Sequence, residues 1–453
     1  MNKNYPRILL AAPSSGSGKT TAVCGLLQAL VDRGNSCVSF KCGPDYIDPM
    51  FHKYVLGIQG GNLDSYFLEE EKVRRQFAAM ADPEGISVIE GVMGYYDGLA
   101  GTSTEASSYD IARITKTPVI LVVNAKGASV SLAALIKGFL DYRPDSLIKG
   151  VILNRTTKEM ARRLTPVIEA LGVKVAGYIE ESSAMKLKSR HLGLVMPEEY
   201  EGLREEMKML AAELEESLDI GLILEIASSA PPLETEEGEN GYERRYPVRI
   251  GVARDEAFCF YYQENLKLLE DMGAELVNFS PLHGETLPDG LCGLLLGGGY
   301  PELYAKELSE NRKMRESIKK AAENGMFLIA ECGGFLYLHE QLEGTDGKCY
   351  PMAGVIPAKA YRTPRLSRFG YIELSGGGER IKAHEFHYWD STAPGDAMRA
   401  EKPLSSRSWN CIHRTDTMVA GFPHLYYPSN PAVAEGWLKC MMENAAGRSG
   451  QEN

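Results

Sequence analysis

The sequence lacks the features that mark several large classes of protein. Its 453 residues include no apolar run of about 18 residues, so no transmembrane helix is expected, and the apolar stretch near the N-terminus is too short for a signal peptide. Positive charge is in the minority, with 49 Lys and Arg against 61 Asp and Glu. Nucleic acids and membrane surfaces are bound through clustered positive charge, so neither is an expected partner.

Cysteine occurs nine times, but in a pattern that zinc sites and disulfide scaffolds do not use. The sequence has no C-x-x-C pair and the count is odd, which argues against a zinc ribbon and against a disulfide-stapled domain. The 44% of hydrophobic and 24% of charged residues are ordinary for a globular protein. We therefore expect a cytoplasmic enzyme with reduced thiols, and the length favours two or three domains.

One stretch of the chain differs in composition from the rest. Residues 229–246 are rich in Pro, Gly and Glu, which predicts an exposed linker between domains of residues 1–228 and 247–445, with a tail at 446–453. Continuous apolar runs alternate with helical stretches in both domains, and this predicts α/β folds built on parallel sheets. The runs expected as strands are residues 7–12, 36–41, 87–89, 119–124, 150–154, 248–253, 294–296 and 326–330, with helices at 20–32 and 302–323.

The first chemical motif is a glycine-rich loop at residues 11–20, AAPSSGSGKT. An apolar run precedes it and a helical stretch follows, which is the order that a phosphate-binding P-loop needs. Ser17, Gly18 and Lys19 would contact phosphate, and Thr20 would hold Mg²⁺. Pro13 departs from the usual pattern, which has Gly there. The alternative is a plain Gly/Ser-rich turn.

Acidic and amide side chains follow the neighbouring strands. Lys41 ends a strand and is followed by Asp45, Tyr46 and Asp48; these positions are either a solvated loop or part of a site at the sheet edge.

Glu90 ends the next strand, where an acid would chelate Mg²⁺, and Asp97 lies on a Gly-flanked loop that follows. The alternative for Glu90 is a carboxylate without a metal. Asn154 ends another strand, and its amide suits either an adenine edge or a turn.

A second site centres on a cysteine. Residues 326–338, MFLIAECGGFLYL, place Cys332 between an apolar run and a helix, with Gly333 beside it. This pattern is typical of a nucleophile elbow. Gly298 and Gly299 follow another strand and would bring backbone N–H groups to an oxyanion, unless they form an ordinary turn. The thiol needs a base, and spacing alone does not choose among His424, His384 and His387.

Together these motifs resemble the cobyrinic acid a,c-diamide synthase family. The resemblance spans nearly the whole chain. It covers the P-loop, FKCGPDYIDP, VIEGVMGYYDG, GGGYPE, AECGGFLYL, the region from Tyr361 to Tyr371, HEFHYW and AGFPHLYYPSNP. It implies a dethiobiotin-synthetase-like ATP-binding amidoligase domain followed by a class I glutamine amidotransferase domain with a flavodoxin-like fold. It also implies ATP and glutamine as co-substrates, Mg²⁺, and a corrinoid or related tetrapyrrole, and it leaves a homodimer open.

The resemblance implies a role for each motif. Cys332 would attack the amide of glutamine and His424 would stand at the position of the base, while His384 and His387 would be structural or line the glutamine pocket. The residue pattern itself, apart from the resemblance, predicts that Lys41 and Asn154 join the ATP site and that Asp45 joins Thr20 and Glu90 in the metal shell. It also predicts an acyl-phosphate site made of Asp45, Tyr46, Asp48 and Asp97. Many class I amidotransferases have a carboxylate two residues after the histidine, whereas this chain has Tyr426 there.

The family reaction would form an acyl phosphate at the c- and a-acetates of cobyrinic acid and displace the phosphate with ammonia. Two alternatives remain open. One is the same amidation of hydrogenobyrinic acid or nickel-sirohydrochlorin, because the substrate ring is read by the shape of the pocket. The other is a P-loop switch ATPase whose second domain is regulatory.

Overall fold

A computed structural model describes residues 2–181, 199–236, 242 and 244–449. The chain divides into two compact units, Met1–Gly238 and Glu239–Asn453. Within the described ranges, none of the helices combines the length and the hydrophobicity that crossing a bilayer requires.

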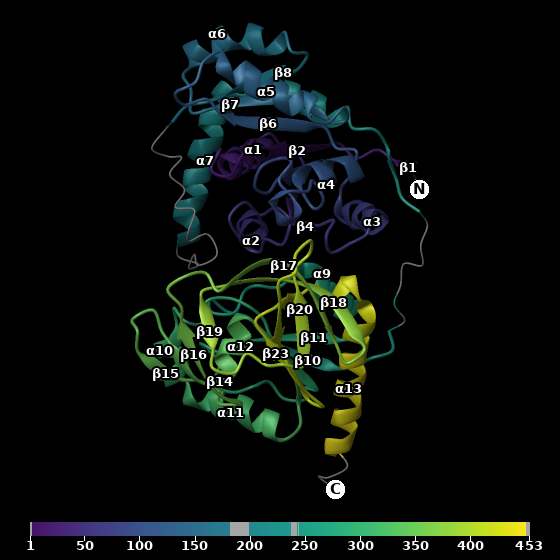
Figure 1. Cartoon of the computed structure of the whole chain (residues 1–453), viewed down its shortest axis with the longest axis vertical. Helices are drawn as coiled ribbons and strands as arrows, with labels where there is room; N and C mark the ends of the chain where they lie inside the picture. Colours follow the sequence, from purple (N-terminus) through teal and green to yellow (C-terminus); the bar gives the residue numbers. More distant parts are fainter. Residues whose placement is uncertain (1, 182–198, 237–241, 243, 450–453) are drawn as a thin grey trace. The chain divides into compact units, whose positions relative to one another are not determined.

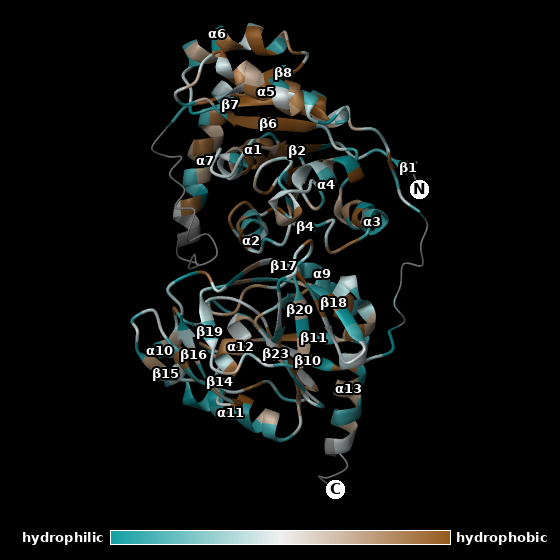
Figure 2. Ribbon diagram, in the orientation of Figure 1, coloured by the Kyte–Doolittle hydropathy of each residue, from teal (hydrophilic) through white to brown (hydrophobic). Residues whose placement is uncertain are grey.

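A fully parallel sheet of seven described strands forms the centre of the first unit (Figure 1). Its central strands are buried along nearly their whole length, which explains why they read as continuous apolar runs and why they are brown in Figure 2. In pairing order the strands are β4 (Gly60–Leu63), β3 (Cys37–Cys42), β5 (Ile86–Glu90), β2 (Arg7–Ala11), β6 (Val119–Asn124), β7 (Ile148–Asn154) and β8 (Lys174–Ile179). The helices are α1 (Lys19–Asp32), α2 (Ile47–Tyr54), α3 (Glu70–Met80), α4 (Ser108–Ile114), α5 (Ser131–Asp141), α6 (Lys158–Glu169), α7 (Glu199–Ser217) and α8 (Ile220–Ser228).

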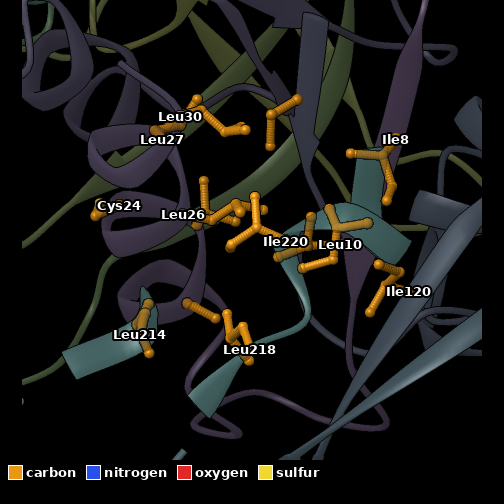
Figure 3. Packing of buried hydrophobic residues seen from close by; sticks show 14 of the residues in the cluster. Ile8, Leu10, Cys24, Leu26, Leu27, Leu30, Ile120, Leu214, Leu218 and Ile220 are labelled. Carbon is orange, nitrogen blue, oxygen red and sulfur yellow. The ribbon is translucent and has the colours of Figure 1, made fainter. Parts of the chain in front are cut away.

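The core on one face of this sheet joins helices that are far apart in sequence. Side chains of α1, among them Leu26 and Leu30, pack with Leu10 of β2 and with Leu214 of α7 (Figure 3). All of these side chains are completely buried. The helix that follows the glycine-rich loop is therefore held by a core built from both ends of the unit.

Arg7, at the start of β2, attaches the end of the first unit to its central sheet. Its guanidinium is fully buried and donates to the carbonyl oxygens of Thr115 at 2.9 Å and Pro231 at 2.7 Å. Close by in sequence, β9 (Leu233–Glu234) pairs with β1 (Asn2–Lys3). The stretch expected as a linker, residues 229–246, thus begins with a strand that belongs to the first unit, and the division into domains at residues 228 and 247 stays a prediction.

The second unit contains three described sheets. The first is parallel except for its edge strand β22, in the order β11 (Glu275–Phe279), β10 (Arg249–Ala253), β12 (Gly293–Leu296), β13 (Phe327–Glu331), β23 (Met418–Gly421) and β22 (His413–Thr415). The second is antiparallel, in the order β21 (Ser408–Cys411), β20 (Met398–Glu401), β17 (Arg368–Gly376), β18 (Glu379–His387) and β24 (His424–Leu425). The third contains β15 (Cys349–Pro351), β14 (His339–Glu343), β16 (Ile356–Arg362) and β19 (Trp389–Ser391), and the helices are α9 (Gln263–Asp271), α10 (Ala305–Glu310), α11 (Arg312–Glu323), α12 (Gly333–Leu338) and α13 (Pro431–Ser449).

One helix expected from the sequence, residues 302–323, is two helices. α10 ends at Glu310, and Asn311 leaves the helical region with φ −77° and ψ 69°. The side-chain oxygen of Asn311 caps α11 by accepting from the amide of Met314, and its amide nitrogen donates to the carbonyl oxygens of Pro281 and Gly284. An asparagine that makes these bonds stabilises a helix start better than a helix interior.

Candidate functional site

The glycine-rich loop of the first unit lies between β2 and α1, as the sequence predicts. Gly18 adopts φ 92°, a left-handed conformation, and a Cβ at this position would lie 2.1 Å from Nδ2 of Asn154. Both facts require glycine. The amide of Asn154 donates to the carbonyl oxygen of Ser17 at 2.7 Å, so the end of β7 supports the loop directly. The ammonium of Lys19 donates to the carbonyl oxygen of Met93, in the loop after β5.

Four predicted site residues meet beside this loop. The hydroxyl of Thr20 donates to Oε1 of Glu90 at 2.6 Å, and the ammonium of Lys41 donates to the same oxygen at 2.9 Å. Lys41 also forms an ion pair with Asp48. Lys41, Asp48 and Glu90 are all buried. The carboxyl ends of the parallel strands β3 and β5 bring these groups together, as expected for a ligand site at this edge of a sheet.

Burial sets the charge balance of this cluster. Burial and the neighbouring Asp48 carboxylate raise the pKa of Glu90 to about 7. Burial and the neighbouring Lys41 ammonium lower the pKa of Lys19 to about 8. Both shifts favour the neutral form of a buried group. A bound polyphosphate would complement the positive charge of Lys19, and a divalent cation would complement the negative charge of Glu90.

The remaining predicted residues of this unit lie around the cluster. Oδ1 of Asp45 accepts from the backbone amides of Ile47 and Asp48 at the start of α2, and among the described residues no direct bond joins Asp45 to Thr20 or Glu90. Tyr46, the next residue, is buried. The Oδ2 atom of Asp97 accepts from the amide of Gly94, in the loop that Lys19 contacts.

His52 is a residue that sequence reasoning missed. It lies on α2, one turn after Asp48, and only 1% of it is exposed. Its Nδ1 lies 2.6 Å from the hydroxyl of Ser39, and its Nε2 lies 3.6 Å from the sulfur of Cys24 and 3.9 Å from Oε2 of Glu90. Burial lowers the pKa of His52 to about 4, so it packs behind Glu90 as a neutral ring. The available signal was its spacing of four residues from Asp48, which places both on one face of a helix.

In the second unit, Cys332 forms the predicted elbow. It lies between β13 and α12 with φ 45° and ψ −101°, which is strained for any residue with a side chain. The backbone amide of Cys332 donates to the carbonyl oxygen of Gly421 at 2.8 Å. This bond extends the pairing of β13 with β23 up to the turn. The strain and the position are those of a nucleophile elbow.

The segment Gly298–Gly299 lies between the predicted base and the turn that carries the thiol. A Cβ at Gly298 would lie 2.4 Å from Cε1 of His424, so only glycine leaves room for the imidazole. A Cβ at Gly333 would lie 3.0 Å from the backbone nitrogen of Gly299. One loop therefore contacts His424 on one side and the residue after Cys332 on the other. Backbone amides that approach so closely are suited to hold an oxyanion.

The two candidate catalytic groups are both buried and both held neutral. Burial, then the negative charge of Glu302, raises the pKa of the Cys332 thiol. Burial, then the neighbouring ring of His384, lowers the pKa of His424 well below its usual value. A neutral imidazole is the form that accepts a proton. The pair therefore has the protonation states that a thiol nucleophile and its base need before the reaction.

Two further residues, which the sequence did not single out, fix the chain around His424. The buried carboxyl group of Glu331 accepts from the hydroxyl of Tyr427 at 2.9 Å and from the amide of Leu425. Asn265 on α9 donates to the carbonyl oxygen of Leu425 at 2.7 Å and accepts from the amide of Tyr427 at 2.9 Å. The segment that carries His424 is therefore bound to the strand that carries Cys332.

The two rival histidines occupy different places. His384 lies opposite His424 in the pairing of β18 with β24, and the two rings stack. Nδ1 of His387 lies 2.6 Å from the carbonyl oxygen of Trp389, and its ring stacks on Phe422 with centroids 4.0 Å apart. The ring that meets the backbone of Gly298 is that of His424.

Two protein-family models match the chain. Residues 8–195 match the model of the CobQ/CobB/MinD/ParA nucleotide-binding domain, and residues 249–426 match that of the CobB/CobQ-like glutamine amidotransferase domain. The chain thus belongs to the class of glutamine-hydrolysing amidotransferase ligases with a nucleotide-binding domain.

Relatives of nearly full length define the family. Cobyrinate a,c-diamide synthase of Caldanaerobacter subterraneus is 40% identical, covering 92% of this chain and 94% of its own. The cobyrinate a,c-diamide synthase of Listeria innocua is 39% identical and covers 94% of this chain and 97% of its own. That of Thermoplasma volcanium is 37% identical and covers 96% of this chain and 97% of its own. The chain belongs to the cobyrinate a,c-diamide synthase family, which confirms the resemblance and the two-domain α/β fold predicted from the sequence.

Proposed function

We propose that this chain uses ATP and glutamine to convert the a- and c-acetate carboxylates of cobyrinic acid into amides, a step of cobalamin synthesis. The names of its full-length relatives support the substrate. The two clusters described above support the two halves of the chemistry. A cytoplasmic location, where ATP and glutamine are at hand, goes with this proposal.

In the amidotransferase unit, Cys332 is the nucleophile and His424 the base. His424 takes the thiol proton while the sulfur attacks the side-chain carbonyl carbon of glutamine. The amides of Gly298, Gly299 and Gly333 hold the oxyanion of the tetrahedral intermediate. The imidazolium then returns the proton to the departing nitrogen, which leaves as ammonia. Water attacks the resulting thioester, and glutamate is released as the thiol re-forms.

The contact of one loop with both His424 and Gly333 carries this assignment. The backbone of Gly298–Gly299 leaves room for the imidazole ring and lies against the glycine that follows Cys332. Cys332 itself is held in a positive-φ conformation, with its amide bonded to Gly421. A cysteine that had only a packing role would have no reason to occupy such a strained turn beside a loop of the oxyanion type.

In the nucleotide-binding unit, the loop from Ser17 to Thr20 receives the phosphates of ATP, and Lys19 contributes its charge. Asn154 supports this loop from β7, and we assign it to the nucleotide site. A substrate carboxylate attacks the γ-phosphorus, which gives an acyl phosphate and ADP. Ammonia then attacks the acyl carbon, phosphate leaves, and the amide results. Lys41, Asp45, Tyr46, Asp48 and Asp97 form the proposed acyl-phosphate site.

Thr20 and Glu90 fit a magnesium ion. Both oxygens lie at the phosphate loop, and Oε2 of Glu90 is buried without a hydrogen-bond partner among the described residues. Among all the residues that the structure describes, no group of three or more His, Cys, Asp or Glu side chains could hold a metal ion. Mg²⁺, however, is usually held by only one or two protein oxygens together with phosphates. When bound, it neutralises the charge of the transferring phosphoryl group. Asp45 stays a proposed third ligand.

The experiment that tests the function is incubation with ATP, Mg²⁺ and glutamine and with one tetrapyrrole at a time. Cobyrinic acid, hydrogenobyrinic acid and nickel-sirohydrochlorin are compared, and the product mass shows one or two replacements of a carboxylate by an amide. Diamidation of cobyrinic acid in preference to the other rings is expected. Preference for another ring would reassign the substrate, and the absence of released glutamate would favour a switch ATPase. Sedimentation shows whether the chain forms the homodimer that the family resemblance leaves open.

A further inference from the structure

The position two residues after the proposed base, which is acidic in many class I amidotransferases, holds no carboxylate in this chain. In cysteine–histidine sites a third group holds the ring toward the thiol. Two residues after His424 stands Tyr426, which is buried and packs edge-on against Tyr262 with ring centroids 5.2 Å apart. A tyrosine in this place does not carry the negative charge of a carboxylate. This position therefore supplies no charged group to orient the imidazole of His424.

His384 is in contact with His424. The two residues are directly opposite each other in the antiparallel pairing of β18 with β24. Their rings are nearly parallel, at 23°, with centroids 5.2 Å apart. The backbone of Gly298 contacts Cε1 of the same His424 ring. The imidazole of His424 is thus confined by a stacked ring and by a glycine backbone.

His384 is itself fixed in place. It is 7% exposed, and its Nδ1 lies 3.3 Å from the hydroxyl of Tyr262, within hydrogen-bonding distance. Tyr262 is 1% exposed and precedes α9, whose Asn265 binds the chain on both sides of Tyr426. Tyr426, Tyr262, His384 and His424 therefore form a continuous row of buried rings.

We propose that His384 is the positioning residue that holds the His424 imidazole toward Cys332, in place of a carboxylate, and that Tyr262 fixes the His384 ring. This inference rests on the glutaminase half of the proposed function. The role is one of orientation: His384 makes no bond to substrate. A flat ring in register across two strands restricts the rotation of its partner, and aromatic rings in this arrangement attract each other.

The test compares His384→Ala, His384→Phe and Tyr262→Phe in the full-length protein. Glutaminase kcat and KM are measured per active thiol, counted with a glutamine-analogue electrophile that labels Cys332. We expect His384→Ala to lower kcat at least tenfold with KM for glutamine changed less than threefold. His384→Phe keeps a stacked ring and should recover most of the lost kcat. Tyr262→Phe should lower kcat about threefold.

Phe386→Ala is the matched control, because Phe386 lies on the same strand and is 47% exposed. Its kcat should equal that of the unaltered protein. The proposal is overturned by kcat within twofold of normal in His384→Ala, by equal losses in the alanine and phenylalanine variants, or by a change confined to KM, which would place His384 in the glutamine pocket. If the unaltered protein releases no glutamate, the proposed function fails instead.

Discussion

The backbone amide of Cys332 binds the carbonyl oxygen of Gly421, three residues before His424. The proposed nucleophile and base thus follow adjacent strands of one sheet, β13 and β23, and do not come from distant loops. Glu331 and Asn265 tie down the chain around His424. The relative position of thiol and imidazole is therefore a property of the sheet, and this determines what substitutions should do.

Replacing the proposed nucleophile should separate the two activities of the chain. Cys332→Ala is expected to abolish glutamine hydrolysis, while amidation driven by added ammonia persists, because the ATP-dependent site lies in the other unit. Product mass with each nitrogen source gives the answer. Cys349→Ala, at an exposed thiol, should behave normally. Loss of the ammonia-driven reaction in Cys332→Ala, with ATP binding intact, would contradict the division of labour.

The alkylation rate of Cys332 should rise with pH throughout the neutral range. Its thiol pKa is raised and the pKa of His424 is lowered, so the thiol and the imidazole are both neutral at rest. Only the thiolate reacts with iodoacetamide, so the rate should grow roughly tenfold per pH unit from about pH 6 to about pH 8. Loss of glutaminase activity follows the reaction. A rate that stays constant down to about pH 5 would instead indicate a thiolate–imidazolium pair.

The side chain of Glu331 should hold the segment around His424 through the hydrogen bonds that it accepts from Tyr427 and Leu425, and not through a negative charge. Burial raises the pKa of Glu331 to about 8, so the group is largely protonated at neutral pH. Glu331→Gln is neutral and retains an acceptor, and it should keep glutaminase kcat within about threefold. Glu331→Ala leaves two buried donors unpaired, which costs about 1–3 kcal/mol for each, and it should lower kcat at least tenfold. Equal kcat values for the two variants would argue against a role of these two hydrogen bonds in positioning His424.

Glu90 should be required for the ATP-dependent reaction whichever nitrogen source is used. Its carboxylate receives bonds from Thr20 and Lys41 and is a proposed magnesium ligand. Glu90→Gln should lower the rate of ammonia-driven amidation at least a hundredfold and should raise the Mg²⁺ concentration needed for half-maximal rate, while glutaminase activity is kept. Glu84→Gln, in the exposed turn before the same strand, is the control. Unchanged ammonia-driven kinetics would remove Glu90 from the metal shell.

The buried carboxyl group of Glu385 should make the folded protein less stable as the pH rises. Burial raises its pKa from the ordinary value of 4.5 to about 7, so the folded protein binds the proton more tightly than the unfolded chain. Stability is then lost as the pH rises from 4.5 through 7, by at most about 3.5 kcal/mol at about 1.4 kcal/mol per pKa unit.

Glu385→Gln should remove this dependence on pH. Its gain in Tm is expected to be larger at about pH 8 than at about pH 5, because the native carboxyl group is charged only at the higher value. Scanning calorimetry at both pH values measures the gain. The exposed Glu340→Gln serves for comparison. Equal shifts at the two pH values would refute the argument.

The sequence predicts the parts of the protein that are continuous along the chain. The strands around Leu10, Ile120 and Ile329 are apolar runs buried on both faces, and the loops at Gly18 and Cys332 follow directly from strands of this kind. Such signals depend on local residues and on sterics, so they can be read without knowing the fold.

The contacts that depend on distant residues could not be read in this way. Asn154 supports the phosphate loop across 137 residues of sequence, and Asn265 binds Tyr427 across 162. Single polar residues with such partners have no periodicity to mark them. The helix break at Asn311 was missed for the same reason, because carbonyl oxygens from residues 281–284 stabilise it.

The environment of Arg7 bears on how the chain can be divided. Its buried guanidinium donates to the carbonyl oxygen of Pro231, and burial lowers its pKa to about 10. A fragment that stops at residue 228 would deprive this cation of one acceptor and would strip the first strand, β1, of its neighbour β9. Anyone who wishes to study the nucleotide-binding half in isolation should therefore cut after residue 236, beyond the point where the chain has paired with its own beginning.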